Sequence, residues 1–317
     1  MNEPLQLTTL GEAMIVMDPL SRGSLRHVRA FEKHVGGAEL NVAVGLARLG
    51  HRAGWSGLLG DDEFGKEIMS FMRGEGVDVS GARLDPDAPT GLYFKEWGNL
   101  GKLRVHYYRA GSAASRMSFD DLDLDHLLSG GILHLTGITP ALSESCRDLV
   151  ERLLSAANEH GTFVSFDANI RWTLLEGRDP HKLLEPLAAR ADILFLSDDE
   201  AEFLFGGSEP GSIREAFGSL RAGTVVVHRA DGAFAVEDGK VYEKAAYPVE
   251  VVDTVGAGDA FVAGYLSGRL RGWSPEECLE LANACGACAV SAPGDLIGLP
   301  TEEEALALMS GRPGVER

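Results

Sequence analysis

Residues 132–138 read ILHLTGI, and three similar short segments follow along the chain: TFVSFDAN at 162–169, ADILFLS at 191–197 and TVVVHRA at 224–230. We interpret all four as strands, because they are short and apolar. The segments between them have the apolar spacing of helices, as in SCRDLVERLLSAANEHG at 145–161. Strands that alternate with helices predict right-handed crossovers and a mainly parallel sheet. The expected fold class is therefore α/β, with helices on both faces of the sheet in an αβα arrangement.

The N-terminal third combines this alternation with two regions that interrupt it. Residues 5–16, 26–35 and 53–60 are predicted strands, and residues 36–50 and 62–77 are predicted helices. TGLYFKEW at 90–97 and LRVHYYRA at 103–110 alternate polar and apolar residues around GNLGK, which is the pattern of a hairpin. We interpret residues 11–35 and 89–112 as a small β-sheet lid, inserted in a single domain that spans residues 1–317.

The composition supports a large folded core and excludes some partners. With 317 residues, 44% of them hydrophobic, the chain is long enough to bury an α/β core. Its formal net charge of −19 would repel nucleic acid and anionic lipid, so neither is an expected partner. No apolar run approaches the ~18 residues that cross a bilayer. The N-terminus lacks the basic and apolar regions of a signal peptide, which favours a cytoplasmic location.

Two features could suggest a metal or redox site, but packing is the preferred interpretation of both. Cys285 and Cys288 form a CxxC inside ANACGACAVSA, without a second CxxC or a His pair to complete a zinc site. This run of small residues indicates a tightly packed buried helix. His134 is interpreted as a core residue, because the nine histidines show no pairing at metal-ligand spacing.

Ligands of an open parallel sheet bind outside the carboxyl ends of its strands, so the residues directly after the predicted strands are the site candidates. They are Gly36, Gly37, Asp167, Asn169, Arg171, Ser197, Glu200, Gly232 and the stretch DTVGAGDAF at 253–261. Glycines, carboxylates and an arginine on one rim indicate a site for an anionic ligand.

DTVGAGDAF is the strongest of these candidates. Gly256 and Gly258 permit a tight turn that exposes consecutive N–H groups, and a helix is predicted to follow at residues 260–268. Exposed amides at a helix N-terminus favour a phosphate oxygen through hydrogen bonds and the macrodipole. Asp259, in the first helical turn, could accept a proton from a hydroxyl that attacks phosphorus. The alternative is that Asp259 only caps the helix.

Two motifs resemble the signatures of the ribokinase, or PfkB, family of sugar kinases. Gly36 and Gly37 followed by Asn41 are similar to the first signature, and DTVGAGDAF is similar to the second. GGAELNVAVGLARLG, TGLYF, YYRAGSA, LHLTGITPAL, DANIR and DTVGAGDAF, in this order, resemble the 2-keto-3-deoxygluconate kinases within that family. The resemblance covers nearly the whole chain. It implies a ribokinase-like fold with a β-lid, ATP as the donor, and Mg²⁺ held mainly through the phosphates.

The resemblance also implies roles for individual residues. Asp259 corresponds to the catalytic base, and the amides of Gly256, Ala257 and Gly258 correspond to the anion hole for the transferred phosphoryl group. Glu200, in SDDE, corresponds to a glutamate that acts near the metal and its waters. Family relatives often bind K⁺ beside the anion hole, and the candidate carbonyls here lie near Asp253 and Val255, although the partner loop SAPGDLIG at 291–298 diverges.

The nucleotide side of the site departs from the family pattern. The nucleotide loop usually reads Gly-x-x-Gly, whereas here it is RADG, with Arg229 first and Gly232 last. Arg229 either crowds this loop or donates to a phosphate. No Walker A sequence occurs, so backbone and metal must hold the phosphates. The residues expected to contact the nucleotide are Asn169, Arg171, Ser197 (where the family usually has Asn), Arg229, Gly232, Gly256, Gly258 and Asn283, the last in the adenine pocket.

The expected acceptor pocket contains two arginines. Tyr107 and Arg109 are two apart on a predicted strand and therefore point to the same side of the lid. Two arginines aimed at one cleft of so acidic a chain favour an anionic acceptor, because an arginine fork binds a carboxylate bidentately. The alternatives are an Arg109 paired with a nearby acid and an Arg171 that contacts only ATP. The expected acceptor contacts are Gly36, Gly37, Asn41, Tyr93, Tyr107, Arg109, Ile138, Arg171 and Asp259.

The leading hypothesis is an ATP-dependent kinase that converts 2-keto-3-deoxygluconate to 2-keto-3-deoxy-6-phosphogluconate. Fructose, ribose, 5-keto-2-deoxygluconate and nucleosides are competing acceptors on the same fold, and the sequence leaves the gluconate and galactonate epimers open. A dinucleotide-dependent oxidoreductase would need GxGxxG after the first strand, which LGEAMIV at 10–16 lacks. The intact GAGD argues against a non-catalytic sensor. A homo-oligomer is expected through the lid, because an exposed sheet edge favours association.

Overall fold

A computed structural model of the chain describes residues 4–98, 103–216 and 221–311. In these residues the main sheet has nine strands in the order β13-β12-β11-β10-β9-β8-β1-β4-β5, and only β12 and β13 are antiparallel to their neighbours. The strands are β1 (Leu7–Leu10), β4 (Ala53–Gly60), β5 (Ala82–Asp85), β8 (Ile132–Thr136), β9 (Phe163–Asp167), β10 (Ile193–Ser197), β11 (Thr224–Arg229), β12 (Gly232–Glu237) and β13 (Lys240–Ala245).

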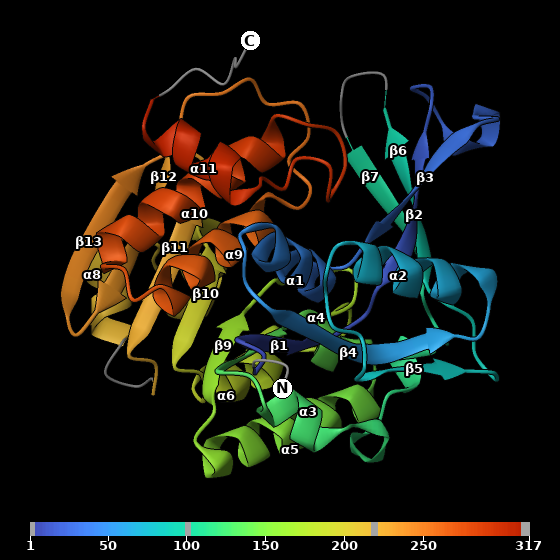
Figure 1. Ribbon diagram of the computed structural model, residues 1–317, viewed down its shortest axis with the longest axis horizontal. Coiled ribbons are helices and arrows are strands. Elements are labelled where there is room, and N and C mark those ends of the chain that lie inside the picture. The colour runs from blue at the N-terminus through green and yellow to red at the C-terminus, as the bar shows by residue number, and fades with distance from the viewer. Residues whose placement is uncertain (1–3, 99–102, 217–220, 312–317) are drawn as a thin grey trace.

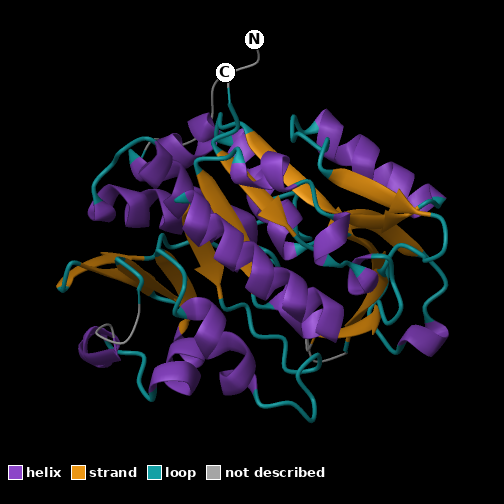
Figure 2. Cartoon of the chain, turned by 90° about the horizontal axis from the view of Figure 1, so that it is seen from below, coloured by secondary structure: helices purple, strands orange, loops and turns teal. Residues whose placement is uncertain are grey.

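Helices cover both faces of this sheet, as Figure 2 shows. Ile193 and Phe195 of β10 pack with α1, α2, α9 and α10, whereas Leu194 and Leu196 pack on the opposite face with α3, α5, α6, α7 and α8. Burial on both faces explains why the strands read as continuous apolar runs. The predicted α/β class is confirmed. The helices are α1 (Ala38–Arg48), α2 (Glu63–Gly74), α3 (Leu124–Leu128), α4 (Ile138–Leu142), α5 (Glu144–His160), α6 (Pro180–Ala188), α7 (Asp198–Phe205), α8 (Pro210–Ala216), α9 (Ala257–Leu270), α10 (Pro275–Val290) and α11 (Glu302–Met309).

A second, four-stranded sheet stands apart from the main sheet, at the upper right of Figure 1. Its order is β3-β2-β6-β7, formed by β2 (Met14–Pro19), β3 (Phe31–Gly36), β6 (Leu92–Trp97) and β7 (Leu103–Tyr108). The antiparallel pairing of β6 with β7 agrees with the predicted hairpin, whose turn at 99–102 lies outside the described residues. One face of this sheet buries Met14, Val16 and Tyr93. We refer to it below as the lid sheet.

Three details differ from the sequence prediction. The segment 5–16 forms two strands instead of one, because its backbone hydrogen-bonding partner changes within four residues. Gly11 N donates to Ser56 O of β4 over 3.2 Å, whereas Ile15 N donates to Gly91 O of the lid region over 3.1 Å. The predicted strand at 26–35 begins only at Phe31. The edge strand β5 and the β12–β13 hairpin were not predicted. Among the described residues, no helix is long and apolar enough to span a bilayer.

Candidate active site

A cavity of about 120 Å³ lies between the lid sheet and the N-terminus of α9, and we call it the lid pocket. All residues expected to contact the acceptor line it except Gly36, which lies next to Tyr93 and Asp295. The fold therefore brings together residues that are far apart in the sequence. Three acidic residues that were not predicted also line the pocket, namely Glu12, Glu39 and Asp295.

Asp259 lies in the first turn of α9 and faces the lid pocket. Asn41 of α1 donates a hydrogen bond from Nδ2 to Asp259 Oδ2 over 2.6 Å. Burial raises the pKa of Asp259 to about 7, against the lowering effects of the Asn41 hydrogen bond and the charge of Arg171. A carboxyl group with a pKa near neutrality is suited to general-base chemistry. The helix-cap alternative does not explain this buried position, because Gly256 is the N-cap of α9.

The turn before α9 is shaped to receive an anion. Gly256 has φ +80°, and a Cβ there would lie 2.6 Å from the carbonyl oxygen of Asp295. Glycine is therefore required both by the left-handed backbone and by the contact. Among the described residues, nothing accepts the amide hydrogens of Gly256 and Gly258, and Ala257 N makes only a long 3.4 Å bond to Thr254 O. These free amides at a helix N-terminus fit a phosphoryl group.

Arg109 is paired with a nearby acid, which was the alternative to a role in binding the acceptor. Its Nε donates to Glu12 Oε2 over 2.7 Å, its Nη2 contacts the same oxygen, and both side chains are buried. Ser112 Oγ donates to the other Glu12 oxygen over 2.7 Å. The guanidinium also lies 5.2 Å from the ring centre of Tyr107. Although Arg109 lines the pocket, its charge already has an internal partner.

Arg171 lines the same pocket from the loop after β9 and remains open to solvent. Among the described residues, its guanidinium has no carboxylate at ion-pair distance and makes no hydrogen bond. Desolvation is the largest influence on its pKa and lowers it, but the charges of Tyr107, Asp259 and Asp167 raise it on balance. Arg171 therefore presents a positive charge to the pocket.

Asp167 and Asn169 lie close to Asp259. Asn169 has φ +38°, and its Nδ2 donates to Asp167 Oδ2 over 3.2 Å and, more weakly, to Asp259 Oδ1 over 3.5 Å. Burial, followed by the charges of Glu200 and Asp259, raises the pKa of Asp167 well above its ordinary range. A cationic or hydrogen-bonding ligand at this end of β9 would stabilise the ionised form of Asp167.

Glu200 joins two segments at the rim of the sheet. Its Oε2 accepts from Ser197 N over 2.8 Å in the capping box of α7, and its Oε1 accepts from Ile170 N over 2.6 Å. Both oxygens are therefore engaged by backbone amides. In the described part of the chain no group of three or more His, Cys, Asp or Glu side chains is placed to hold a metal ion. The geometry fits an indirect role of Glu200 near a phosphate-bound Mg²⁺, which stays a prediction.

The predicted nucleotide residues follow β9 (Asn169 and Arg171), end β10 and β11 (Ser197 and Arg229), begin β12 (Gly232), cap α9 (Gly256), or belong to α9 and α10 (Gly258 and Asn283). Arg229 donates from Nη2 to Glu243 Oε1 of β13 over 2.5 Å and lies over the Phe234 ring, so an internal acid already binds its side chain. Asn283 of α10 donates from Nδ2 to the carbonyls of Lys244 (3.1 Å) and Ala245 (3.2 Å). Its amide donors therefore anchor α10 to β13, and the predicted adenine contact stays a prediction.

Lys95 is a site residue that sequence reasoning missed. It is fully buried on the lid strand β6, with Nζ 3.2 Å from Asp253 Oδ2 and 3.0 Å from Asp295 Oδ1. Its position two residues after Tyr93 on a strand was a usable signal, because both side chains must then point to the same face. The Asp253 carboxylate has an internal cation, and nothing in the described residues supports the K⁺ prediction at Asp253 and Val255.

The two packing interpretations are confirmed. Cys285 is buried in α10, and burial raises the pKa of its thiol above the usual range, which makes it unreactive. His134 is buried in β8 with Nδ1 3.0 Å from Ser165 Oγ, and burial lowers its pKa to about 3.

Comparison with known proteins agrees with this geometry. The model of the pfkB family of carbohydrate kinases matches residues 5–302. A 2-dehydro-3-deoxygluconokinase of Thermoproteus tenax is 37% identical over 96% of this chain and 94% of its own length. Fructokinase-1 of Oryza sativa subsp. japonica is 33% identical over 96% of this chain and 97% of its own length.

Solved structures show the same fold. The 2-dehydro-3-deoxygluconokinase of Thermotoga maritima superposes with a TM-score of 0.90 at 28% identity, covering 98% of this chain and 99% of its own. A protein described as ribokinase II of E. coli, in complex with ATP and Mg²⁺, gives a TM-score of 0.89 at 25% identity, covering 97% and 100%. The chain belongs to the PfkB family of carbohydrate kinases and is a phosphotransferase that acts on a sugar hydroxyl.

Proposed function

We propose that this kinase uses ATP and Mg²⁺ to phosphorylate the terminal hydroxyl of 2-keto-3-deoxygluconate. The observation that carries the proposal is the guanidinium of Arg171, which faces the lid pocket without a carboxylate partner among the described residues. A 2-keto-3-deoxy sugar acid has a carboxylate at one end and a primary hydroxyl at the other. It can therefore pair with Arg171 while its hydroxyl reaches Asp259.

The other charges of the lid pocket are already balanced within the protein. Glu12 is paired with Arg109, and Asp295 is held by Lys95 and by a 2.6 Å hydrogen bond from Tyr93 Oη. Glu39 accepts from Thr136 and Thr139, and burial raises its pKa, which favours its neutral form. Arg171 is left as the cation for a ligand, and its fork suits a carboxylate bidentately.

Asp259 would act as the general base. Asn41 holds the Asp259 carboxylate by its Oδ2 over 2.6 Å, whereas Oδ1 has only the weak 3.5 Å contact from Asn169 and is the oxygen that would accept the proton of the attacking hydroxyl. ATP, when bound, supplies the phosphoryl group, and Mg²⁺ neutralises part of its charge. The amides of Gly256, Ala257 and Gly258 would hold the oxygens of that group in the anion hole.

Asn41 offers a further contact for a polyhydroxy substrate. Its Oδ1 is buried and has no hydrogen-bond partner. A buried acceptor without a partner costs about 1–3 kcal/mol, and a substrate hydroxyl could satisfy it. The orphaned oxygen thus supports a polar acceptor next to Asp259.

Fructose is the second candidate, because a fructokinase is among the relatives that match over nearly their whole length. The deciding experiment measures ADP release by the purified protein with ATP–Mg²⁺ and a panel of acceptors. The panel contains 2-keto-3-deoxygluconate, its galactonate epimer, 5-keto-2-deoxygluconate, fructose and ribose. We expect the highest kcat/KM with a 2-keto-3-deoxy acid. A higher value with fructose would refute the sugar-acid proposal while leaving the kinase assignment intact.

A further inference from the structure

Two side chains on one face of the lid strand β6, Tyr93 and Lys95, contact acidic residues beside the 253–258 turn. Tyr93 Oη donates to Asp295 Oδ2 over 2.6 Å. Lys95 Nζ lies 3.0 Å from Asp295 Oδ1 and 3.2 Å from Asp253 Oδ2, with Asp18 at 3.8 Å. A lysine that is fully buried among three carboxylates is costly unless the arrangement is specific, because each ion loses its hydration.

We propose that Lys95 is a positioning residue, whose ammonium fixes the 253–258 turn in the geometry that receives the phosphoryl group and makes an added monovalent cation unnecessary. Lys95 is not among the residues that line the lid pocket, although it contacts one of them, Asp295. It acts through the residues that back the turn.

The contacts from Lys95 to the turn are continuous. Asp253, held by Lys95, accepts from Val255 N through Oδ1 and from Gly294 N through Oδ2, both over 3.1 Å. The carbonyl of Asp295 lies directly behind Gly256, where a Cβ would come within 2.6 Å. Movement of either carboxylate would therefore displace the amides of the anion hole. Because Lys95 lies on the lid sheet, lid placement and turn geometry are coupled.

The charge of Lys95 is as important as its contacts. Asp253 and Asp295 are both buried beside the 253–258 turn, which would bind the negatively charged phosphoryl group. Without a cation, the negative charge of the two carboxylates would repel the phosphoryl group and weaken its binding. Although desolvation is the largest influence on the pKa of Lys95 and lowers it, the charges of Asp295 and Asp253 raise it on balance. The ammonium stays protonated and balances the two carboxylates.

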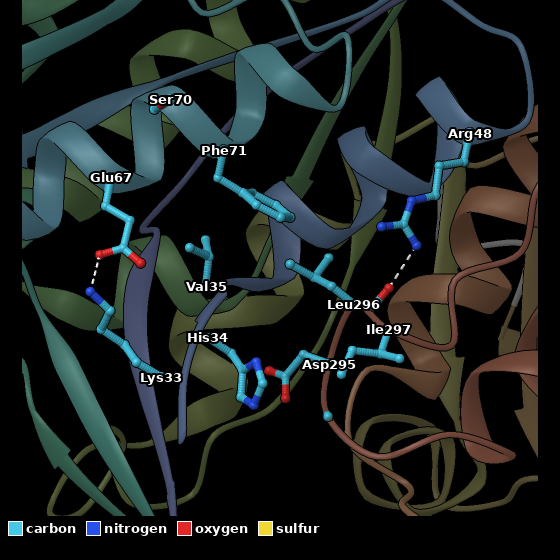
Figure 3. A pocket seen from close by; sticks show the side chains of 11 residues that line it. Lys33, His34, Val35, Arg48, Glu67, Ser70, Phe71, Asp295, Leu296 and Ile297 are labelled. Atoms are coloured by element: carbon cyan, nitrogen blue, oxygen red, sulfur yellow. Dashed lines mark hydrogen bonds and ion pairs between the residues drawn. The ribbon is translucent and has the colours of Figure 1, made fainter. Parts of the chain in front are cut away.

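Asp295 is also reached from the outside of the molecule. It lies on the wall of a second cavity of about 480 Å³, between α2, the lid strand β3 and the segment 294–297. Figure 3 shows this cavity, with Asp295 beside His34 and with Phe71 of α2 on the far side. A small amine could therefore approach the carboxylates if the Lys95 side chain were removed.

The test uses the full-length protein with ATP–Mg²⁺ and its best acceptor. In Lys95→Ala we expect kcat to fall by about 10²-fold, as for a displacement of reacting groups by ~1 Å, with a smaller change in KM for the acceptor. Methylammonium, which replaces the deleted ammonium, should restore a large part of the lost kcat, and tetramethylammonium at equal ionic strength should not. The wild type should have the same rate in K⁺, Na⁺ and tetramethylammonium salts.

Lys33→Met is the matched control. Lys33 lies on the neighbouring lid strand β3, is partly exposed and pairs with Glu67. We expect this variant to keep the wild-type kcat and to show no response to methylammonium. A purely structural role of Lys95 would lower stability but would not make kcat respond to small cations.

A second variant covers the case in which Lys95→Ala does not fold. Lys95→Met combined with Asp295→Asn removes a cation and an anion together, which is milder for a buried pair than removal of one partner. It should fold and still show the reduced kcat. Wild-type kcat in a folded Lys95 variant, a loss that methylammonium does not reverse in Lys95→Ala, or a K⁺ requirement of the wild type would each overturn the inference.

This inference rests on the proposed function only for the acceptor used in the assay. If the sugar acid is not the substrate, the wild type fails on it, and the Lys95 test is run with whichever sugar of the panel is turned over. The two proposals therefore fail independently.

Discussion

Asn41 donates a 2.6 Å hydrogen bond to Asp259 across 218 residues of sequence. The contact joins α1, which follows the Gly36–Gly37 pair, to α9, which begins within the GAGD stretch. Both family signatures therefore meet at a single carboxylate. This geometry fixes the orientation of Asp259 toward the lid pocket and leads to the first two predictions.

Replacement of Asp259 by Asn should lower turnover by about 10²–10⁴, the usual contribution of a positioned general base. The fold and ATP binding should persist, because Asn keeps the shape of the side chain. Steady-state kinetics and nucleotide titration of the variant check this. Near-normal turnover would mean that Asp259 is not the base.

The pH dependence follows from the pKa of Asp259, which burial raises to about 7. The base is active when deprotonated, so kcat/KM should rise with pH and level off above about 7. The free energy of unfolding should change in the opposite direction and fall as the pH rises. An unfolded Asp titrates near ~3.9, so the folded chain alone holds this proton between about pH 4 and 7, and stability falls as pH rises through that window.

Unfolding of wild type and Asp259→Asn between pH 4 and 8 measures this effect. The variant cannot titrate at this position, so its stability relative to wild type should increase with pH and then level off above about 7. A constant difference would show that the carboxyl does not titrate in that range.

Arg109 should matter more for stability than for substrate binding. Arg109→Met leaves Glu12 buried without its cation, and breaking such a pair commonly costs 3–5 kcal/mol, so we expect about that loss. Urea unfolding measures it. Arg104→Met, at an exposed position of β7, the strand that ends directly before Arg109, is the control and should have little effect. Equal stability of the two variants would contradict the internal pairing of Arg109.

Glu200→Gln separates the metal role of this residue from its capping role. If the Glu200 carboxylate orients waters of a phosphate-bound Mg²⁺, the variant should need more Mg²⁺ for half-maximal activity at fixed ATP. Ser274→Ala is the control, because it removes the hydroxyl of the exposed capping box of α10, which the site does not use, and should cost about 1 kcal/mol of stability without changing the Mg²⁺ requirement. Identical Mg²⁺ titrations for Glu200→Gln and wild type would leave Glu200 a capping residue only.

The fold class could be predicted because its signals are local. Four apolar strands with helical segments between them specify a parallel sheet, and the alternation around Tyr93 and Tyr107 specifies a hairpin. The turn at Gly256 was also predictable, since its glycines and Asp259 are adjacent in the sequence. The break of segment 5–16 was not predictable, because the same apolar pattern suits one strand or two.

The ionic partners in the site could not be predicted from local patterns. Lys95 and Asp253 are 158 residues apart, and Arg109 and Glu12 are 97 residues apart. In a chain with 48 acidic residues, the choice of partner depends on which loops the fold brings together. This is why two arginines were expected at the acceptor, whereas the structure leaves one of them without an internal acid.

Arg171→Ala provides the most direct test of the account. The measurement is kcat/KM for 2-keto-3-deoxygluconate and for fructose in wild type, Arg171→Ala and Arg171→Lys, with Arg147→Ala on the exposed face of α5 as the control. Loss of a charge partner costs about 2–5 kcal/mol when the pair is buried and less where water reaches it, so we expect the lower part of that range for the acid and little change for fructose. Arg171→Lys should recover only part of the lost kcat/KM for the acid, because lysine keeps the positive charge but lacks the planar guanidinium fork. An equal fractional loss on both substrates would show that Arg171 serves ATP, and it would contradict the sugar-acid assignment.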